Sequence, residues 1–201
     1  MREPQPEPLR IGVLASQGDF AAHVRILREL GAEAFEVRAP GDLEGLDGLV
    51  IPGGESTTIS KAIERDDLGP ALREHAAAGR PILGTCAGMI VCDADHLGLI
   101  DARTRRNAFG RQLQSFEAEL DLKGIGTEPI RAVFIRAPWI ESHGPEVEVL
   151  ASWEGHPVAI RDGSVLACSF HPELTDDSRV HALLMAMATG ARERTEEEAR
   201  G

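Results

Sequence analysis

The feature that most constrains this chain is the segment Gly-Thr-Cys-Ala-Gly at residues 84–88. It follows a short apolar run at 81–83, which indicates the end of a buried strand. A reactive residue between two glycines at that point is typical of a nucleophile elbow, a strained turn from strand into helix. Such a turn places the sulfur of Cys86 at a helix N-terminus, where N–H groups favour the thiolate. Alone, the motif is equally compatible with a structural Cys in a tight turn.

A second segment favours the reactive interpretation. Near the C-terminal end, an apolar run at 165–168 leads into Ser-Phe-His-Pro-Glu at 169–173. A thiol nucleophile needs a base, and the base needs a group that orients it. His171 can be the base and Glu173 can hold its second ring nitrogen, with Pro172 restricting the backbone between them. The sequence therefore predicts a Cys86–His171–Glu173 triad.

The apolar pattern predicts alternating strands and helices. Strands are expected at 11–14, 34–37, 49–51 and 82–83, and helices at 20–30, 57–65, 70–78 and 180–188, the last ending near Gly190. Strands and hairpins are expected in 113–122 and 147–170. This order predicts an α/β fold, with a doubly wound, mostly parallel sheet flanked by helices and an antiparallel extension. Ligands bind such sheets at the carboxyl ends of the strands, where Cys86 and His171 both fall.

The chain is expected to form a single domain at 10–190. Residues 1–9 are rich in Pro and Glu, and 191–201 carry three consecutive Glu and no apolar anchor, so both ends are expected to be flexible tails. The net charge of −12 disfavours nucleic acid and anionic membrane surfaces as partners. The first ten residues lack the apolar stretch of a signal peptide, and the three cysteines form no disulfide framework. A cytoplasmic location is therefore expected.

Six segments carry a resemblance to a known family: 11–18, 52–58, 84–89, 106–112, 134–138 and 169–175. With these, the chain resembles the class I, triad-type glutamine amidotransferases. More narrowly, Pro-Gly-Gly-Glu-Ser-Thr-Thr at 52–58 and Arg-Asn-Ala-Phe-Gly-Arg-Gln at 106–112 resemble the glutaminase subunits of pyridoxal 5′-phosphate synthase.

The resemblance implies a substrate site around the predicted triad. It places the residues that bind glutamine at Gly54, Glu55, Ser56, Arg106, Ile135 and Arg136. The amides of Gly53, Gly54 and Ala87 are implied to form the oxyanion hole. Gln17 is implied to lie near that strand and to couple partner docking to activation. Without the family, 52–56 could equally be a plain loop in which Ser56 or Thr57 caps the next helix.

The resemblance also implies the reaction and the partner. Cys86 would attack the side-chain amide of L-glutamine and yield glutamate and ammonia, with no metal or bound cofactor. The ammonia would pass to a barrel-type pyridoxal 5′-phosphate synthase subunit in a hetero-oligomer, which makes the pyridoxal phosphate (vitamin B6). Seen without the family, the other histidines show no metal-ligand spacing, and Cys92 and Cys168 are expected to be structural.

One departure leaves alternatives open. Between the elbow and His96, the family usually has a longer helix and loop, whereas only residues 90–95 remain here. The helix behind Cys86 is therefore expected to be short, which puts the rigidity of the elbow in question. The alternatives are a glutaminase subunit that serves another amidotransferase, and a partner-binding subunit whose catalysis is impaired.

Overall fold

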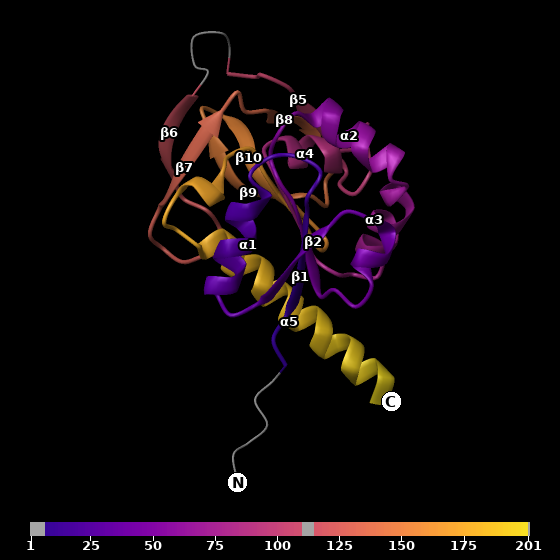
Figure 1. The fold of residues 1–201 in the computed structure, drawn as a ribbon. Coiled ribbons are helices and arrows are strands. Elements are labelled where there is room, and N and C mark those ends of the chain that lie inside the picture. The colour runs from indigo at the N-terminus through magenta and orange to yellow at the C-terminus, as the bar shows by residue number, and fades with distance from the viewer. Residues whose placement is uncertain (1–6, 110–114, 201) are drawn as a thin grey trace.

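The structure is a computed structural model that describes residues 7–109 and 115–200 (Figure 1). Its strands are β1 Arg10–Leu14, β2 Glu33–Val37, β3 Gly48–Ile51, β4 Ile82–Thr85, β5 Ala102–Arg105, β6 Ser115–Leu120, β7 Ile130–Ile135, β8 Trp139–His143, β9 Glu148–Trp153, β10 His156–Asp162 and β11 Val165–Cys168. Its α-helices are α1 Phe20–Glu29, α2 Ser56–Arg65, α3 Leu68–Ala77, α4 Ala87–Cys92 and α5 Arg179–Arg200. Two short 3₁₀ turns, η1 Pro40–Leu43 and η2 Pro172–Leu174, complete the described elements.

The central sheet has the strand order β2-β1-β3-β4-β11-β10-β9 in the described part of the chain. The pairs from β2 to β11 are parallel, and β10 and β9 add to β11 as an antiparallel edge. Two antiparallel pairs, β5 with β8 and β6 with β7, lie outside this sheet. The predicted fold class, a mostly parallel doubly wound sheet with an antiparallel extension, is confirmed.

Helices cover both faces of the parallel strands, which is why the central strands β3, β4 and β11 are buried at every position (Figure 1). Successive side chains of a strand point to opposite faces. In β3, Val50 packs with α1 and α5, whereas Leu49 and Ile51 pack with α2, α3 and α4. In β4, Leu83 and Ile82 divide between the same two clusters. The sheet is therefore held between two apolar layers, and its strand ends are fixed in space.

An aromatic cluster joins the β6–β7 hairpin to the end of β11. Phe134 is fully buried, stacks on Phe116 with ring centroids 4.5 Å apart, and meets Phe170 edge-on at 5.8 Å. The backbone N–H of His171 donates to the carbonyl of Val133 at 2.8 Å. These contacts hold the carboxyl end of β7 beside the carboxyl end of β11.

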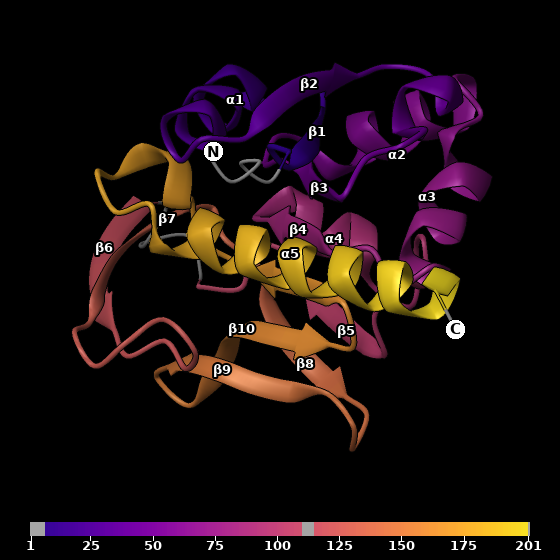
Figure 2. The same cartoon turned by 90° about the horizontal axis from the view of Figure 1, so that it is seen from below.

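The C-terminal segment differs from expectation. Helix α5 does not end near Gly190 but continues through the predicted tail to Arg200, so the predicted end of this helix is wrong (Figure 2). Ala191 is buried, and the guanidinium of Arg192 donates to Asp47 at 2.9 Å and to the carbonyls of Glu7 and Pro8. This anchor depends on the loop before β3, about 145 residues away along the chain. The domain limits 10–190 stay a prediction.

None of the helices in the described ranges combines the length and the apolar character that a transmembrane helix requires. Strands β5, β7 and β8 were not expected from the sequence. The exposed positions of β5 and β8 carry Arg and Glu, so the apolar alternation that indicates a strand is weak there.

The anchor of α5 yields a stability prediction. Replacing Arg192 with Ala removes a partly buried ion pair and two hydrogen bonds, and is expected to lower the free energy of unfolding by about 1 kcal/mol. Amide hydrogen exchange should become faster at residues 193–199, because the last turns lose their tether. Arg194→Ala is the matched control, since Arg194 has no ion pair among the described residues. Equal exchange in both variants would contradict the anchoring role.

Candidate active site

Cys86 occupies a strained turn between β4 and α4. Its backbone has φ 48° and ψ −108°, a conformation that a non-glycine residue adopts at an energetic cost. Its side chain is almost buried, and its N–H donates to the carbonyl of Cys168 at 2.8 Å. The turn is crowded, because a Cβ on Gly88 would overlap the carbonyl oxygen of Ile51. The geometry expected of a nucleophile elbow is therefore present.

The parallel pairing of β4 with β11 brings the base to the nucleophile. Both strands end at the same edge of the sheet, with Cys168 in register with Thr85. His171 follows β11, and it borders the same cavity as Cys86. Its Nδ1–H donates to Glu173 Oε1 at 2.7 Å. The three residues of the predicted triad thus lie together, with His171 bonded to Glu173 and bordering the same cavity as Cys86.

The environment of His171 favours the imidazolium. Burial lowers its pKa, but its hydrogen bonds and charge interactions with Cys86 and Glu173 outweigh burial and raise the pKa to about 10. For Glu173, burial raises the pKa, while the hydrogen bond from His171 and the charges of His23 and His171 outweigh it and lower the pKa. An ionised Glu173 therefore orients a protonated His171 toward the sulfur.

The loop after β3 closes over the array and requires glycine. A Cβ on Gly53 would lie 2.7 Å from Cε1 of His171 and 3.3 Å from Cβ of Cys86. Gly54 has φ 149°, a conformation that L side chains rarely adopt. The side-chain oxygen of Gln17 accepts from the backbone N–H of Glu55 at 3.2 Å. Gln17 thereby ties the turn after β1 to the loop at Gly53 and Gly54.

Glu55 caps α2, which neither Ser56 nor Thr57 does. Its carboxylate accepts from the backbone N–H groups of Thr57 at 3.1 Å and Thr58 at 2.8 Å. These bonds lower the pKa of Glu55 to about 2, and the bond from the N–H of Thr57 contributes most. Arg106 also donates to Glu55, at 2.8 Å. The alternative in which Ser56 or Thr57 caps this helix is therefore not realised, because the longer carboxylate of Glu55 reaches two amides and a guanidinium together.

Arg136 and Ile135 lie at the end of β7, opposite the loop. The carbonyl oxygen of Ile135 is 3.9 Å from Sγ of Cys86, and Arg136 has φ 45°. Among the described residues, the guanidinium of Arg136 forms no ion pair or hydrogen bond. It therefore has its donors free for an anionic group in the cavity.

A cavity of about 360 Å³ joins these parts. The predicted residues that line it are Gln17, Gly54, Glu55, Ser56, Cys86, Ala87, Arg106, Ile135, Arg136 and His171. Glu173 lies behind His171 and does not line the cavity. Gly18, Ile90, Asn107 and Pro138 also line it and were not singled out from the sequence, although three of them lie inside the motif segments. Gly110, Arg111 and Gln112 of the quoted motif fall outside the described residues.

Helix α4 is short, as the departure from the family predicted. It has six residues, about 9 Å of helix. All six are buried, and Ile90 supplies a wall of the cavity. The helix is therefore held by packing on both sides rather than by its length.

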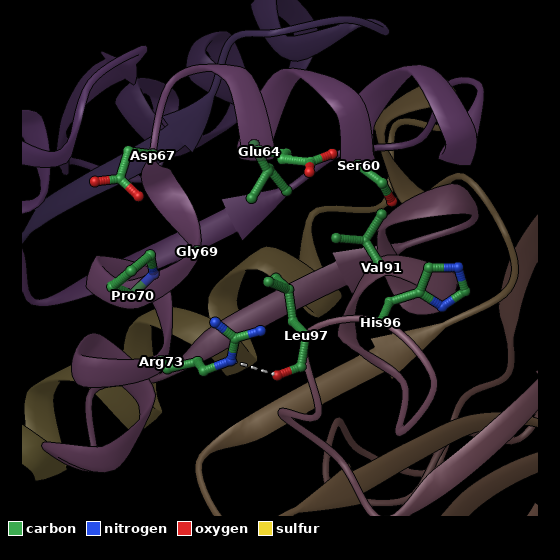
Figure 3. Close-up of a pocket in the computed structure, with 10 residues that line it drawn as sticks. Ser60, Glu64, Asp67, Gly69, Pro70, Arg73, Val91, His96 and Leu97 are labelled. Carbon is green, nitrogen blue, oxygen red and sulfur yellow. Dashed lines mark hydrogen bonds between the residues drawn. The ribbon is translucent and has the colours of Figure 1, made fainter.

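A second cavity of about 310 Å³ lies between α2, α3 and the segment after α4 (Figure 3). Arg73 donates there to the carbonyl of Leu97 at 3.0 Å. This second cavity shares no lining residue with the cavity at Cys86.

The other two thiols are inert, because burial raises the pKa of Cys92 to about 12 and that of Cys168 well above its usual range. Within the described ranges, no group of three His, Cys, Asp or Glu side chains is arranged to hold a metal ion.

The strained cysteine turn and the His–Glu pair on this sheet define a glutamine amidotransferase of class I type. A solved structure, "Crystal structure of glutamine amidotransferase", superposes with a TM-score of 0.85 at 45% identity and covers 89% of this chain and 98% of its own. Residues 13–189 match the SNO glutamine amidotransferase family model, and the chain belongs to that family.

Two curated relatives are named pyridoxal 5′-phosphate synthase subunit PdxT. The protein from Mycobacteroides abscessus is 54% identical over 186 residues, which is 88% of this chain and 96% of the relative. The protein from Shouchella clausii is 50% identical over 186 residues, which is 89% of this chain and 95% of the relative.

The crowding at Gly53 generates a prediction. A Gly53→Ala variant is expected to push the imidazole of His171 away from Cys86, because the new Cβ and Cε1 cannot both keep their places. The contribution of Cys86 to the raised pKa is then lost, and the pKa of His171 should fall from about 10 toward 6.5. An NMR titration of the imidazole measures this. Gly41→Ala is the matched control, since nothing lies within 4 Å of that added Cβ; an unshifted pKa in Gly53→Ala would refute the crowding.

Proposed function

We propose that this chain is the glutaminase subunit of a pyridoxal 5′-phosphate synthase, which hydrolyses L-glutamine to L-glutamate and ammonia at Cys86. The observation that carries the proposal is that Cys86 and His171 line one cavity of about 360 Å³, with Glu173 bonded to His171 from behind. The membership of the SNO glutamine amidotransferase family and the relatives named PdxT support it.

In the first half of the reaction, the sulfur of Cys86 forms a bond to the side-chain amide carbon of glutamine. The amides of Gly53, Gly54 and Ala87 are assigned to the oxyanion, because both segments border the sulfur and carry no side chain that would block the approach. His171 gives its Nε2 proton to the amide nitrogen, the C–N bond breaks, and ammonia leaves. A γ-glutamyl thioester remains on Cys86.

The second half of the reaction uses the same imidazole as a base. In the thioester, the sulfur carries no charge and no proton, so the interactions of Cys86 that raise the pKa of His171 are gone. The neutral imidazole can then take a proton from water, whose oxygen attacks the thioester carbon. The C–S bond breaks, glutamate leaves, and Cys86 returns as the thiolate beside the protonated imidazole. Glu173 keeps the ring in one orientation through both halves.

The α-groups of glutamine need opposite charges at the far end of the cavity. We assign the α-carboxylate to Arg136, whose guanidinium faces the cavity with no partner among the described residues. Arg106 and Glu55 pair with each other at 2.8 Å and present both charges at the rim, which suits an amino acid headgroup. The carbonyl of Ile135 and the side chain of Ser56 supply further polar contacts.

The proposed partner is a barrel-type synthase subunit that takes up the ammonia in a hetero-oligomer. The relatives' name, a synthase subunit, supports a partner. Gln17 is the proposed link between docking and activation, since its side chain already holds the amide of Glu55 beside the oxyanion loop. A cytoplasmic location is proposed as well, because all three cysteines are free thiols and Cys86 must stay reduced.

The nucleophile can be tested directly. A Cys86→Ala variant is expected to lose at least about 10⁴-fold in glutamate release, measured with the synthase subunit present, because no thioester can form. Cys92→Ala is the matched control, since Cys92 is a buried thiol that does not line the cavity. Wild-type activity in Cys86→Ala would end the proposal. No hydrolysis by the wild-type chain with its partner bound would favour the impaired subunit, and activation by a different synthase would favour another amidotransferase.

The pKa of His171 predicts the alkaline side of the pH profile. The free enzyme needs the imidazolium, which persists up to about pH 10. The value of kcat/KM for glutamine, which reports on the free enzyme, is expected to hold from pH 8 to 9 and to fall as the pH rises through 10. Circular dichroism at each pH separates this fall from unfolding. A fall that begins near pH 7 would show that His171 is not stabilised as the cation.

A further inference from the structure

Two fully buried histidines extend the catalytic array beyond Glu173, and the mechanism above does not use them. His23, on α1, places its Nε2 3.4 Å from Oε2 of Glu173. His181, on α5, places its Nε2 2.8 Å from Nδ1 of His23. Both side chains have no exposure to solvent. Polar side chains therefore follow one another from His171 through Glu173 and His23 to His181 on α5.

The carboxylate of Glu173 decides where the protons in this line must lie. Its Oε1 accepts from His171, whereas its Oε2 faces Nε2 of His23 at 3.4 Å, and neither of these two buried atoms has a hydrogen-bond partner among the described residues. An ionised carboxylate can only accept, so Nε2 of His23 must carry a hydrogen. A neutral His23 then has a bare Nδ1, which accepts from Nε2–H of His181.

The charged groups around His23 keep it neutral. It faces Glu173, His171 and Asp19, and it contacts His181. Burial is the largest effect and lowers the pKa of His23, with Glu173 and Asp19 acting in the opposite direction. Burial and His23 lower the pKa of His181 to about 3. Among the three histidines, His171 is therefore the one that carries the extra proton, and the reaction uses that proton there.

A carboxylate held at one oxygen can rotate, whereas a carboxylate held at both cannot. Oε2 of Glu173 is buried without a hydrogen-bond partner, and Nε2 of His23 is the donor atom that faces it, at 3.4 Å. We propose that His23 is a positioning residue of the glutaminase, whose Nε2–H fixes Oε2 of Glu173 and so fixes the imidazole of His171, and that His181 sets the tautomer of His23. This inference rests on the proposed function.

Two polar variants of similar size separate positioning from packing. In His23→Gln, the amide nitrogen stands where Nε2 stood and can still donate to Glu173. In His23→Asn, the shorter side chain reaches only the position of Nδ1, which keeps a polar contact for His181 and leaves Glu173 without a donor. Both are measured in the complex with the synthase subunit, as glutamate release over pH 5 to 9, with thermal melting as the check on folding.

The expected result is a loss in His23→Asn and a rescue in His23→Gln. Asn should lower kcat about 10–100-fold with little change in KM, since His171 loses its orientation but the glutamine contacts remain. Loss of a donor disfavours the ionised form of Glu173, so its pKa rises and the acid limb of kcat/KM moves to higher pH by about one unit. The Gln variant should restore kcat to within about threefold of wild type and the pH of the acid limb to within a few tenths of a pH unit.

His75→Leu is the control for the loss of a buried histidine. His75 lies on α3, is buried like His23, and does not belong to the array. It should keep the wild-type kcat and acid limb. Equal kcat and equal acid limbs in His23→Asn, His23→Gln and wild type would overturn the inference and leave the proposed function intact. Absence of hydrolysis in wild type and in His75→Leu would instead count against the proposed function itself.

Discussion

The parallel pairing of β4 with β11 is the contact on which the site depends. These strands are about 80 residues apart in the chain, and their register sets Cys168 beside Thr85. The next residue after Thr85 is Cys86, whose N–H donates to Cys168, so the nucleophile and the base leave the sheet at one edge. Helices on both faces make a slip of this register costly, because every side chain of β4 would change its apolar layer.

Close approach of backbone segments is the second constraint. The loop at Gly53, the elbow at Cys86 and the ring of His171 share a space in which one added methyl group meets the imidazole. The same crowding explains why α4 needs Gly88 beneath the end of β3. A thiol, an imidazole and two backbone segments can then approach one substrate carbonyl without a side chain between them. The strain at Cys86 is held in place by the packing around it.

The protonation of these side chains follows from how deeply each is buried and from which neighbour each one faces. Each group from Cys86 to His181 has a neighbour that accepts or donates in one direction only, so the proton that moves in the reaction has one favoured position, on His171. A surface triad would lose this bias to solvent screening. The depth of Glu173 and His23 below the cavity is thus as relevant to the chemistry as the distance between Cys86 and His171.

The sequence by itself determined the fold class, the elbow and the His-Pro-Glu turn, because each is a local pattern: an apolar run, glycines at a turn, and residues two apart. It also marked Gly53 and Arg136 through motif segments. Only the tertiary structure decided that Glu55 caps α2 and pairs with Arg106, that α5 continues past Gly190, and that His23 and His181 meet behind Glu173. The contacts of Glu55 with Arg106 and of His23 with His181 join residues about 50 and nearly 160 positions apart, and such partners are chosen by how the layers pack, which no local pattern encodes.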